Sequence, residues 1–322
     1  MQENPLVSII VITYNSSKYV LETLESAKSQ TYQNIELIIS DDCSTDSTVE
    51  ICKNWIDDNK TRFIRTDLIT ATKNNGIPAN CNRGIESAQG DWIKLVAGDD
   101  LLFENCIQDN INFAFNNDGA KIIHSIRVTF KIEDKYKKII QKTKIDSIFN
   151  EKVLTSEDQY QLSLREIGCP PNTLFINRDL LTANKYNENF PLSEDKVFLL
   201  KNLKNGNKFQ FLNKETYWYR VHLESVYHKN KTEHIYTSWY FSSRIPVLRK
   251  YVFKDTSSIE KFGHYYQHLI AHLFKFFFLN KRNLFTRILN KVISFPASYI
   301  FNKSRKKIIK KIAKKYDLKN YL

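Results

Sequence analysis

Three short runs near the start of the chain are apolar almost throughout. They are Val7–Thr13 (VSIIVIT), Ile35–Ser40 (IELIIS) and Trp92–Val96 (WIKLV). Runs of this length that are rich in Val and Ile are typical of parallel strands buried on both faces. The sequence therefore predicts three strands of a buried sheet, each ending where polar residues follow.

Amphipathic segments separate these strands. Lys18–Gln30 places its apolar residues at three- and four-residue spacing, and the serines just before it are available as N-caps. Ser47–Asp57 and Ile77–Ala88 are also predicted to be helices. The alternation of strand and helix predicts an α/β fold with a Rossmann-like, mostly parallel central sheet flanked by helices.

Acidic clusters stand in three places where the chain should leave a buried strand: two follow the runs at Ile35 and Trp92, and the third follows NFPL at residues 189–192. The clusters are Ser40-Asp41-Asp42, Gly98-Asp99-Asp100 and Ser193-Glu194-Asp195. Carboxylates at the carboxyl edge of an open α/β sheet can hold a nucleotide, a divalent cation and an acceptor's proton in one crevice. A single Asp-Asp pair after a strand is more often a turn former or helix cap. Three such clusters in one chain favour a group-transfer enzyme.

Composition places the chain among folded globular proteins. It has 322 residues, of which 42% are hydrophobic, enough for a sizeable core. The 48 Lys and Arg outnumber the 35 Asp and Glu, and residues 303–319 hold nine basic residues against one acidic. The five cysteines form no CxxC pair and are odd in number, so neither a zinc site nor a disulfide framework is indicated. We expect a reducing, cytoplasmic location.

No targeting or membrane-spanning segment is apparent in the sequence. The N-terminal MQENPLVSII has no basic region before its apolar residues, which argues against a signal peptide. No apolar run reaches the roughly 18 to 20 residues that cross a bilayer. Any membrane contact is therefore expected to be peripheral.

The order of the motifs resembles the family 2 glycosyltransferases, which have the GT-A fold and transfer a sugar from a nucleotide diphosphate sugar with inversion. The matching segments are VSIIVITYN, QTYQNIELIISDDCSTDST, NNGIPANCNRGIESAQGDWIKLVAGDD, PLSEDKVFLL and YWYRVHLESV, between residues 5 and 228. The resemblance implies a nucleotide-sugar-binding and catalytic domain at residues 1–230. Residues 231–322 are expected to form a helical, aromatic and basic C-terminal region.

The resemblance also implies a set of nucleotide contacts. Tyr14 would stack near the base, and Asp42 would accept the uracil N3 hydrogen, which suits an acidic acceptor. The remaining members of the set are Ile12, Asn15, Asn74, Gly76, Arg83, Asp100 and Arg220. Gly76 would permit close approach of the backbone, whereas Arg83 is equally consistent with a surface helix residue and Tyr14 with a core aromatic.

Asp99 and Asp100 match the end of the family's metal motif, which implies a Mn²⁺ or Mg²⁺ cofactor. Such cations are usually held by one or two carboxylates together with substrate phosphates. Ala97 stands where the first Asp of the commoner pattern would be. We therefore assign Asp99 to the metal and Asp100 to the metal or the ribose. The structural alternative is a solvated turn that caps the next helix.

Glu194 and Asp195 resemble the family's catalytic pair, in which the Asp is the general base. An aspartate, whose ordinary pKa is near 3.9, is ionised at cytoplasmic pH, and it can take the proton as the acceptor hydroxyl attacks. An ordinary capped helix start is the alternative, and both can hold together. Downstream, the resemblance implies that Arg220 and His222 close over the diphosphate, with His222 also near the metal.

The C-terminal region carries two further patterns. His264, His268 and His272 stand four apart on one face of an expected helix, and their aromatic surroundings favour packing or membrane-interface use over a metal site. The segment 305–316 (RKKIIKKIAKKY) places Ile308, Ile309, Ile312 and Tyr316 on one face and lysines on the rest. Such a helix can lie in an anionic membrane leaflet; nucleic-acid binding and solvated charge without a partner are the alternatives.

The sequence thus predicts a cytoplasmic glycosyltransferase of the hexosyltransferase type, peripheral at the inner face of the membrane. Its expected partners are a nucleotide-sugar donor, with UDP as the nucleotide, a glycan or lipid-linked oligosaccharide acceptor and an anionic membrane surface, but no nucleic acid. Its products would be surface polysaccharides such as capsule or lipopolysaccharide. A nucleotidyltransferase on a similar sheet and a non-catalytic nucleotide-sugar or glycan-binding protein are the competing hypotheses.

Overall fold

The computed structural model describes residues 4–134, 136–143, 145–222, 234–237, 240–241 and 244–322. The chain forms two compact units, each built from separate segments. Unit 1 comprises Met1–Lys152, Cys169–Glu194 and Asn207–Arg220; unit 2 comprises Val153–Gly168, Asp195–Gly206 and Val221–Leu322. The boundary expected near residue 230 lies outside the described residues. Two segments from before that position join the C-terminal helices in unit 2, a long-range arrangement that a boundary drawn along the sequence does not include.

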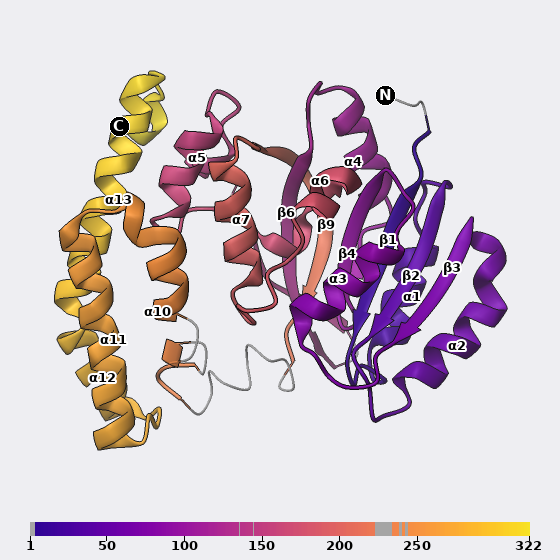
Figure 1. The fold of residues 1–322 in the computed structure, drawn as a ribbon, viewed down its shortest axis with the longest axis horizontal. Helices are drawn as coiled ribbons and strands as arrows, with labels where there is room; N and C mark the ends of the chain where they lie inside the picture. Colours follow the sequence, from indigo (N-terminus) through magenta and orange to yellow (C-terminus); the bar gives the residue numbers. More distant parts are fainter. Residues whose placement is uncertain (1–3, 135, 144, 223–233, 238–239, 242–243) are drawn as a thin grey trace. The chain divides into compact units, whose positions relative to one another are not determined.

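Unit 1 is built on one sheet of nine strands, in the order β3-β2-β1-β4-β8-β6-β9-β5, with β7 paired to β6 (Figure 1). The pairs among β3, β2, β1 and β4 are all parallel. Beyond β4 the sheet is mixed, because β8 runs antiparallel to both β4 and β6 while β9 runs parallel to β6. The strands are β1 (Val7–Thr13), β2 (Ile35–Asp41), β3 (Arg65–Thr70), β4 (Trp92–Ala97), β5 (Leu101–Leu102), β6 (Ile122–Glu133), β7 (Tyr136–Lys142), β8 (Phe175–Asn177) and β9 (Phe209–Arg220).

Helices cover both faces of the parallel part of this sheet. Ile9 and Val11 of β1 join the core cluster that contains Leu24 and Trp55 of α1 and α2. On the other face Ile10 meets Gly84 of α3, where an added Cβ would overlap the Ile10 Cγ2. The helices of unit 1 are α1 (Val20–Lys28), α2 (Thr48–Asn59), α3 (Ile77–Ser87), α4 (Cys106–Phe115) and α6 (Arg178–Ala183), with short turns η1 (Lys60–Arg62), η2 (Ile148–Asn150) and η3 (Pro171–Thr173).

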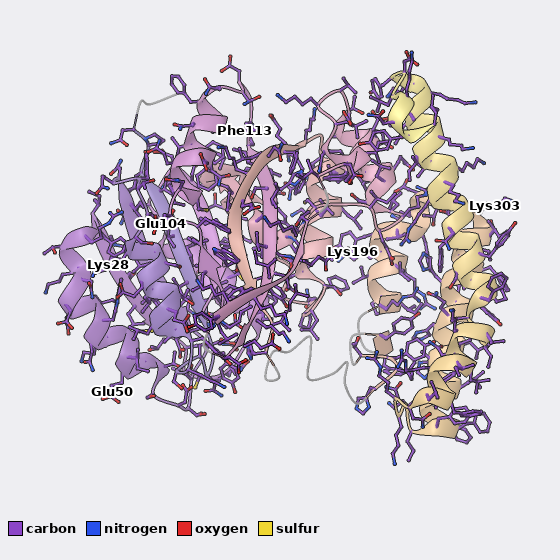
Figure 2. The ribbon with its side chains drawn as sticks, turned by 180° about the vertical axis from the view of Figure 1, so that it is seen from behind. Lys28, Glu50, Glu104, Phe113, Lys196 and Lys303 are labelled. Carbon is purple, nitrogen blue, oxygen red and sulfur yellow. The ribbon has the colours of Figure 1, made fainter. Side chains whose placement is uncertain are left out.

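Unit 2 is helical in its described part. Its long helices α11 and α13 pack together, and α12 packs on both. A small core cluster of Tyr236, Ile270, Ala271 and Phe274 joins α11 to its neighbours. Figure 2 shows the side chains along these helices, with Lys303 of α13 labelled. The elements are α5 (Ser156–Ser163), α7 (Glu194–Lys204, whose first residue belongs to unit 1), α10 (Arg244–Val247), η4 (Leu248–Val252), η5 (Phe253–Asp255), α11 (Ser258–Phe278), α12 (Leu284–Ile293), α13 (Phe295–Lys315) and η6 (Lys319–Tyr321).

The histidines of α11 lie in different surroundings. His264 is buried, with its Nδ1 2.9 Å from the Arg244 guanidinium and its ring beside Phe301. His268 and His272 have their Nε2 atoms 3.2 Å apart.

No helix among the described residues combines the length and apolar character needed to cross a bilayer.

Buried His124 of β6 predicts an acid-dependent loss of stability. Its ring packs against Phe149 and Phe211, its nitrogens have no hydrogen-bond partner among the described residues, and burial lowers its pKa from 6.5 to about 3. The unfolded chain therefore binds this proton below pH 6.5, whereas the folded protein does not until about pH 3. Its contribution to stability is complete above pH 6.5 and is lost as the pH falls through this window.

The measurement compares the wild type with His124→Leu by urea unfolding at a series of pH values. Between pH 6.5 and pH 3 the wild type should lose on the order of 4 kcal/mol more unfolding free energy than the variant. Parallel curves for the two proteins over this range would contradict the assignment of a neutral, buried imidazole.

Candidate active site

The first two acidic clusters lie at the same edge of the sheet, as the sequence predicts. Thr13 at the end of β1 is in register with Asp41 of β2, and Ile12 is in register with Ala97 of β4. The carboxyl ends of these parallel strands therefore meet; Asp42 follows β2 directly, and Asp99 follows β4 after Gly98. Unit 1 thus places Asp42 and Asp99 at the same edge of the sheet.

Asp41 and Asp42 have different tasks although they are adjacent. Asp41 accepts hydrogen bonds from the Thr13 hydroxyl at 2.8 Å and from the Ser44 backbone N–H at 2.8 Å. These bonds hold the end of β1 and the loop after β2 together. Asp41 is therefore a structural residue that fixes the position of its neighbour.

Asp42 is buried and holds the NNG segment before α3. Its Oδ2 accepts the backbone N–H groups of Asn75 at 3.0 Å and Gly76 at 2.7 Å, and its Oδ1 pairs with Arg83 at 3.1 Å. Gly76 has a φ of +87°, a conformation that favours glycine. An ionised carboxylate offers about four acceptor positions, and these bonds use three of them.

Other candidates of this set form hydrogen bonds in the neighbouring segments of the same sheet edge. Asn74 Oδ1 accepts the Gly76 N–H at 3.0 Å. Asn15, with a φ of +50°, accepts the Thr45 N–H through its Oδ1 at 2.8 Å, and the Ile12 carbonyl accepts the Gly98 N–H at 2.9 Å. These groups shape the backbone of the sheet edge.

Tyr14 stands apart from this group because its side chain faces solvent. It is 47% exposed, which is unusual for a ring at the end of a buried strand. The core alternative considered for this residue is therefore excluded by the structure. An exposed aromatic face beside the Asp42 segment is suited to stacking on a planar base.

Asp99 and Asp100 also differ in their surroundings. Asp100 is buried, and its two oxygens accept the Tyr217 hydroxyl at 2.8 Å and the Arg220 backbone N–H at 2.7 Å. Burial raises the pKa of Asp100 well above its usual range, and the charge of Asp99 adds to this rise. Asp100 thus joins the turn after β4 to the end of β9, while the half-buried Asp99 is the more accessible carboxylate.

Arg220 is placed differently from the expected contact with a diphosphate. Its side chain is buried, its Nε donates to the Asp99 carbonyl at 2.7 Å, and its guanidinium pairs with Glu22 at 2.9 Å. The rings of Tyr19 and Phe130 flank it at 4.8 and 5.0 Å. In this structure Arg220 braces the Asp99-Asp100 turn, because protein groups already engage its guanidinium.

Glycine at position 98 is required by close packing at the same turn. A Cβ there would meet Thr13 Cγ2 at 2.9 Å and the Ser16 hydroxyl at 3.1 Å. The Gly98 backbone can therefore lie against the end of β1 only without a side chain. This contact brings the Asp99 turn close to the Tyr14 segment.

Glu194 and Asp195 begin helix α7, where the chain passes from one unit to the other. Glu194 belongs to unit 1 and is buried, and burial raises the pKa of its carboxyl, opposed by backbone N–H groups of residues 192–194. Asp195 belongs to unit 2 and is half-buried, and so is His222. The sheet-edge group described above consists of unit 1 residues alone.

The donors at the sheet edge fit a divalent cation only in part. No cluster of three or more His, Cys, Asp or Glu that could bind a metal occurs among the described residues. Asp99 is half-buried, whereas Asp100 is buried and hydrogen-bonded on both oxygens. Because Mn²⁺ and Mg²⁺ often take most of their remaining ligands from phosphates and water, this donor set suits a cation that arrives with a phosphorylated substrate.

Sequence reasoning missed the residues that hold Asp99 and Asp100 in place. Tyr217 begins the segment YWYRVHLESV but was given no role there, and Glu22 lies in none of the matching segments. Their roles depend on pairings with residues 117 and 198 positions away. The only available signal was the alternation in TYWYR, which places Tyr217 and Tyr219 on one face of β9.

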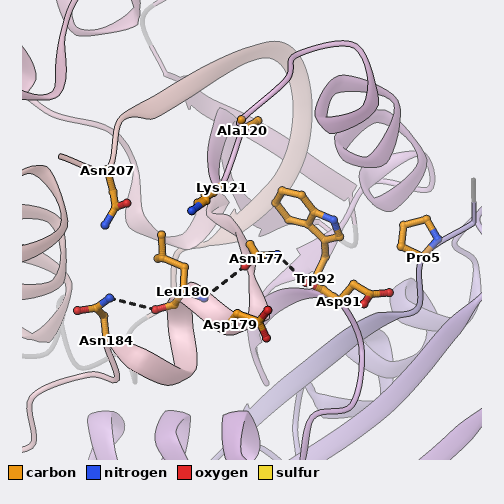
Figure 3. Close-up of a pocket in the computed structure, with 11 residues that line it drawn as sticks. Pro5, Asp91, Trp92, Ala120, Lys121, Asn177, Asp179, Leu180, Asn184 and Asn207 are labelled. Atoms are coloured by element: carbon orange, nitrogen blue, oxygen red, sulfur yellow. Dashed lines mark hydrogen bonds between the residues drawn. The ribbon is translucent and has the colours of Figure 1, made fainter. Parts of the chain in front are cut away.

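A separate hollow of about 800 Å³ lies at the opposite edge of the sheet (Figure 3). Trp92 and Asn177, which are paired at the start of β4 and the end of β8, mark this edge. Asp91, Lys121 and Asn184 also line it. The amino ends of the parallel strands lie at this edge. The hollow is therefore distinct from the site of Asp42 and Asp99, which lies at the carboxyl ends of the strands.

The family of the chain follows from its sequence. The profile of the family described as Glycosyl transferase family 2 matches residues 8–183, which is more than half of the 322 residues. The chain therefore belongs to glycosyl transferase family 2.

Individual proteins agree with this assignment. The chain is 32% identical over 226 residues to "UDP-Glc:alpha-D-GlcNAc-diphosphoundecaprenol beta-1,3-glucosyltransferase WfaP" of Escherichia coli, covering 69% of this chain and 79% of the relative. Against several other curated relatives the match is shorter, and the chain spans only 33% to 44% of their length.

Solved structures confirm the fold. S. aureus TarS 1-349 in complex with UDP-GlcNAc matches with a TM-score of 0.59 at 19% identity, covering 94% of this chain and 90% of that chain. The mannosyltransferase PcManGT from Pyrobaculum calidifontis, in complex with GDP-Man and Mn²⁺, matches with a TM-score of 0.50 at 13% identity, covering 97% and 76%. The α/β fold of the family, predicted from the sequence, is therefore present.

Proposed function

We propose that this protein transfers a sugar, with inversion, from a UDP-sugar to a hydroxyl of a glycan or lipid-linked oligosaccharide in surface polysaccharide synthesis. Membership of glycosyl transferase family 2 supports the class of reaction. The name of the E. coli relative, which pairs UDP-Glc with a diphosphoundecaprenol-linked acceptor, supports the donor and acceptor classes. The structurally similar S. aureus TarS 1-349, which was solved in complex with UDP-GlcNAc, also supports a uridine nucleotide in the donor.

The observation that carries the proposal is the arrangement around Asp42. Its carboxylate is fixed by Asn75, Gly76 and Arg83, whose bonds use three of about four acceptor positions. The uracil N3–H is a donor that suits the fourth position, and the exposed ring of Tyr14 can stack on the base. The backbone at this sheet edge is shaped by Ile12, Asn15 and Asn74. In the proposal these residues contribute to nucleotide binding by holding that backbone in place.

Asp99 would hold Mn²⁺ or Mg²⁺ together with the donor's diphosphate, and His222 of unit 2 is proposed as a further ligand. A bound cation stabilises the negative charge that develops on the leaving nucleoside diphosphate. Asp100 and Arg220 position Asp99, because they fix both ends of the turn that carries it. The half-buried Asp99 carboxylate is therefore the metal ligand in this proposal.

Asp195 is proposed as the general base. Its half-buried carboxylate at the start of α7 would accept the proton of the acceptor hydroxyl while the oxygen attacks the anomeric carbon. Direct displacement then inverts the configuration at that carbon. Glu194 contributes a second carboxyl at the helix start, where the positive end of the helix dipole favours negative charge.

We also place the enzyme in the cytoplasm, at the inner face of the cell membrane, because a lipid-linked acceptor is confined to that surface. The basic C-terminal region supports this location.

The experiment that tests the proposed function is a UDP-release assay with Mn²⁺, a panel of UDP-sugars and a lipid-linked acceptor. Release that requires one UDP-sugar and the acceptor is expected; a protein that binds UDP but never releases it from any donor would contradict the proposal.

The nucleotide assignment predicts the effect of Asp42→Asn. Loss of one charge-assisted hydrogen bond to the uracil should weaken UDP binding about tenfold or more. Titration calorimetry with UDP measures this change, and Asp67→Asn provides a control on the same sheet, away from the carboxyl edge of β1 and β2. Equal UDP affinities of the wild type and Asp42→Asn would remove Asp42 from the base site.

A further inference from the structure

Helix α12 presents an apolar face to solvent. Leu284, Phe285, Ile288 and Val292 are 71%, 63%, 57% and 66% exposed. Their spacing of one, three and four residues places them on one face of the helix. An exposed stripe of four large apolar side chains on a single ten-residue helix is the arrangement expected of an interaction surface.

The opposite side of α12 is firmly attached to unit 2. Leu289 and Ile293 pack against the core cluster around Tyr236 and Phe274, and Asn290 Oδ1 accepts the Tyr236 hydroxyl at 2.5 Å. A capping box at Asn283 fixes the helix start. The outward stripe is therefore held in place by the fold and does not depend on a partner for its shape.

Adjacent segments extend this apolar surface. Phe276, Phe277 and Leu279, at the end of α11 and in the turn to α12, are exposed, as are Phe295 and Tyr299 at the start of α13. Phe285 packs on Phe278, which joins the α11 end to the α12 stripe. We call these exposed residues the apolar face; they are Phe276, Phe277, Leu279, Leu284, Phe285, Ile288, Val292, Phe295 and Tyr299.

The segment that carries the apolar face has charges of one sign. Residues 261–316 contain no Asp or Glu and fourteen Lys and Arg. On α12 itself Arg287 and Lys291 are exposed beside the stripe, one helical turn apart. Long basic side chains at the border of an apolar stripe can reach toward anionic headgroups while their stems lie along the apolar surface.

This charge selects an occupant for the apolar face. A second copy of the chain would bring the same basic border and would repel. An anionic lipid surface would instead attract the lysines and arginines, while the aromatic side chains enter the headgroup region. Phe and Tyr are side chains suited to that depth.

The basic tail acts differently from the expected inserting helix. Of its apolar residues, Ile312 is buried and Tyr316 donates from its hydroxyl to Asp158 at 2.7 Å, while Lys315 pairs with the same carboxylate at 3.0 Å. This part of α13 therefore packs on α5 within unit 2. The lysines at 306, 307, 310, 311 and 314 remain exposed, so the tail can contribute charge, while Ile312 and Tyr316 of its apolar stripe are already engaged within unit 2.

We propose that the apolar face around α12 inserts into the interfacial layer of an anionic bilayer and docks the protein on the membrane. Docking would bring the protein to a lipid-linked acceptor, and this role of the apolar face rests on the proposed function. Binding to lipid can nevertheless be measured without donor or acceptor. An inactive protein that binds vesicles would overturn only the sugar-transfer proposal, and an active protein that ignores vesicles would overturn only this one.

The test is co-sedimentation of the full-length protein with vesicles of equimolar phosphatidylcholine and phosphatidylglycerol. The variant carries Phe285→Ser, Ile288→Ser and Val292→Ser, which alter only exposed side chains. The control carries Ile64→Ser, Phe115→Ser and Ile139→Ser, three exposed apolar residues of unit 1. We expect vesicle affinity to fall about tenfold or more for the α12 variant, no change for the control, and unchanged melting temperatures for both.

Two further arms separate the charge from the apolar contact. Arg287→Gln with Lys291→Gln should weaken binding to the anionic vesicles, and vesicles of phosphatidylcholine alone should bind the wild type more weakly. If instead Lys306→Gln, Lys307→Gln, Lys310→Gln and Lys311→Gln together abolish binding while the α12 variant binds like the wild type, the tail is the docking element and the proposal is wrong. A wild-type dimer that the α12 variant converts to a monomer would likewise overturn it in favour of a second copy.

Discussion

Asp195→Asn is expected to lower the turnover number about 10² to 10⁴-fold, the usual contribution of a general base. Asparagine keeps the size of the side chain but cannot take the proton of the acceptor hydroxyl. Because the substitution leaves the Asp42 segment of unit 1 untouched, UDP affinity should stay within about twofold of the wild type. The expected result is thus a catalytic defect without a binding defect.

UDP release and UDP titration calorimetry on the same preparations measure these two quantities. Asp179→Asn is a matched control, since the Asp179 side chain is 87% exposed on α6. It should retain full turnover. Wild-type turnover in Asp195→Asn would disprove the assignment of the base, and an equal loss of turnover and UDP affinity would show that Asp195 acts on the donor.

The neighbouring carboxylates Asp99 and Asp100 are expected to respond to substitution in opposite ways. Asp99→Asn should lower kcat/KM with Mn²⁺ about 10²-fold or more, since a metal's stabilisation of the leaving group is worth several kcal/mol. Its melting temperature should change little, because Asp99 is half-buried and its carbonyl, which accepts from Arg220, is retained. The expected fall in kcat/KM of Asp99→Asn therefore comes from the metal-dependent reaction and not from a less stable fold.

Asp100→Asn should instead destabilise the fold by about 1 to 3 kcal/mol. The amide would face the Tyr217 hydroxyl and the Arg220 N–H with one acceptor oxygen where the carboxylate has two. Urea unfolding and Mn²⁺ titration of turnover on both variants make the comparison. If Asp100→Asn proved fully stable and Asp99→Asn fully active with Mn²⁺, the division of roles between the two residues would be wrong.

The parallel half of the sheet was predictable from local patterns. The run Val7–Thr13 coincides with β1, and the strands expected at Ile35 and Trp92 begin at those residues. A strand buried on both faces needs continuous apolar sequence, so the signal lies within the strand itself. The amphipathic spacing of α1 and α3 is local for the same reason.

The mixed half of the sheet was not predictable in this way. β8 has three residues, and β9 carries polar side chains along the run NKET. Their positions depend on pairing with β4 and β6, which lie far away in the sequence. The same holds for Arg220, whose basic side chain suggests a phosphate contact until the distant Glu22 and Asp99 are seen to engage it.

The C-terminal region shows a related limit of sequence patterns. An apolar stripe on a basic helix indicates that the stripe is covered, but it does not indicate whether protein or lipid covers it. In α13 the partner is α5, through Asp158, whereas the stripe on α12 remains exposed. Only the folded arrangement distinguishes the two helices.

A crystal structure of the protein with UDP and Mn²⁺ tests the central claim most directly. We expect the uracil N3–H to donate to Asp42 beside the Tyr14 ring, with the diphosphate and the cation at Asp99 and the Asp195 carboxylate directed toward the diphosphate. A nucleotide bound in the hollow beside Trp92, or an Asp195 that points away from the bound diphosphate, would contradict the account.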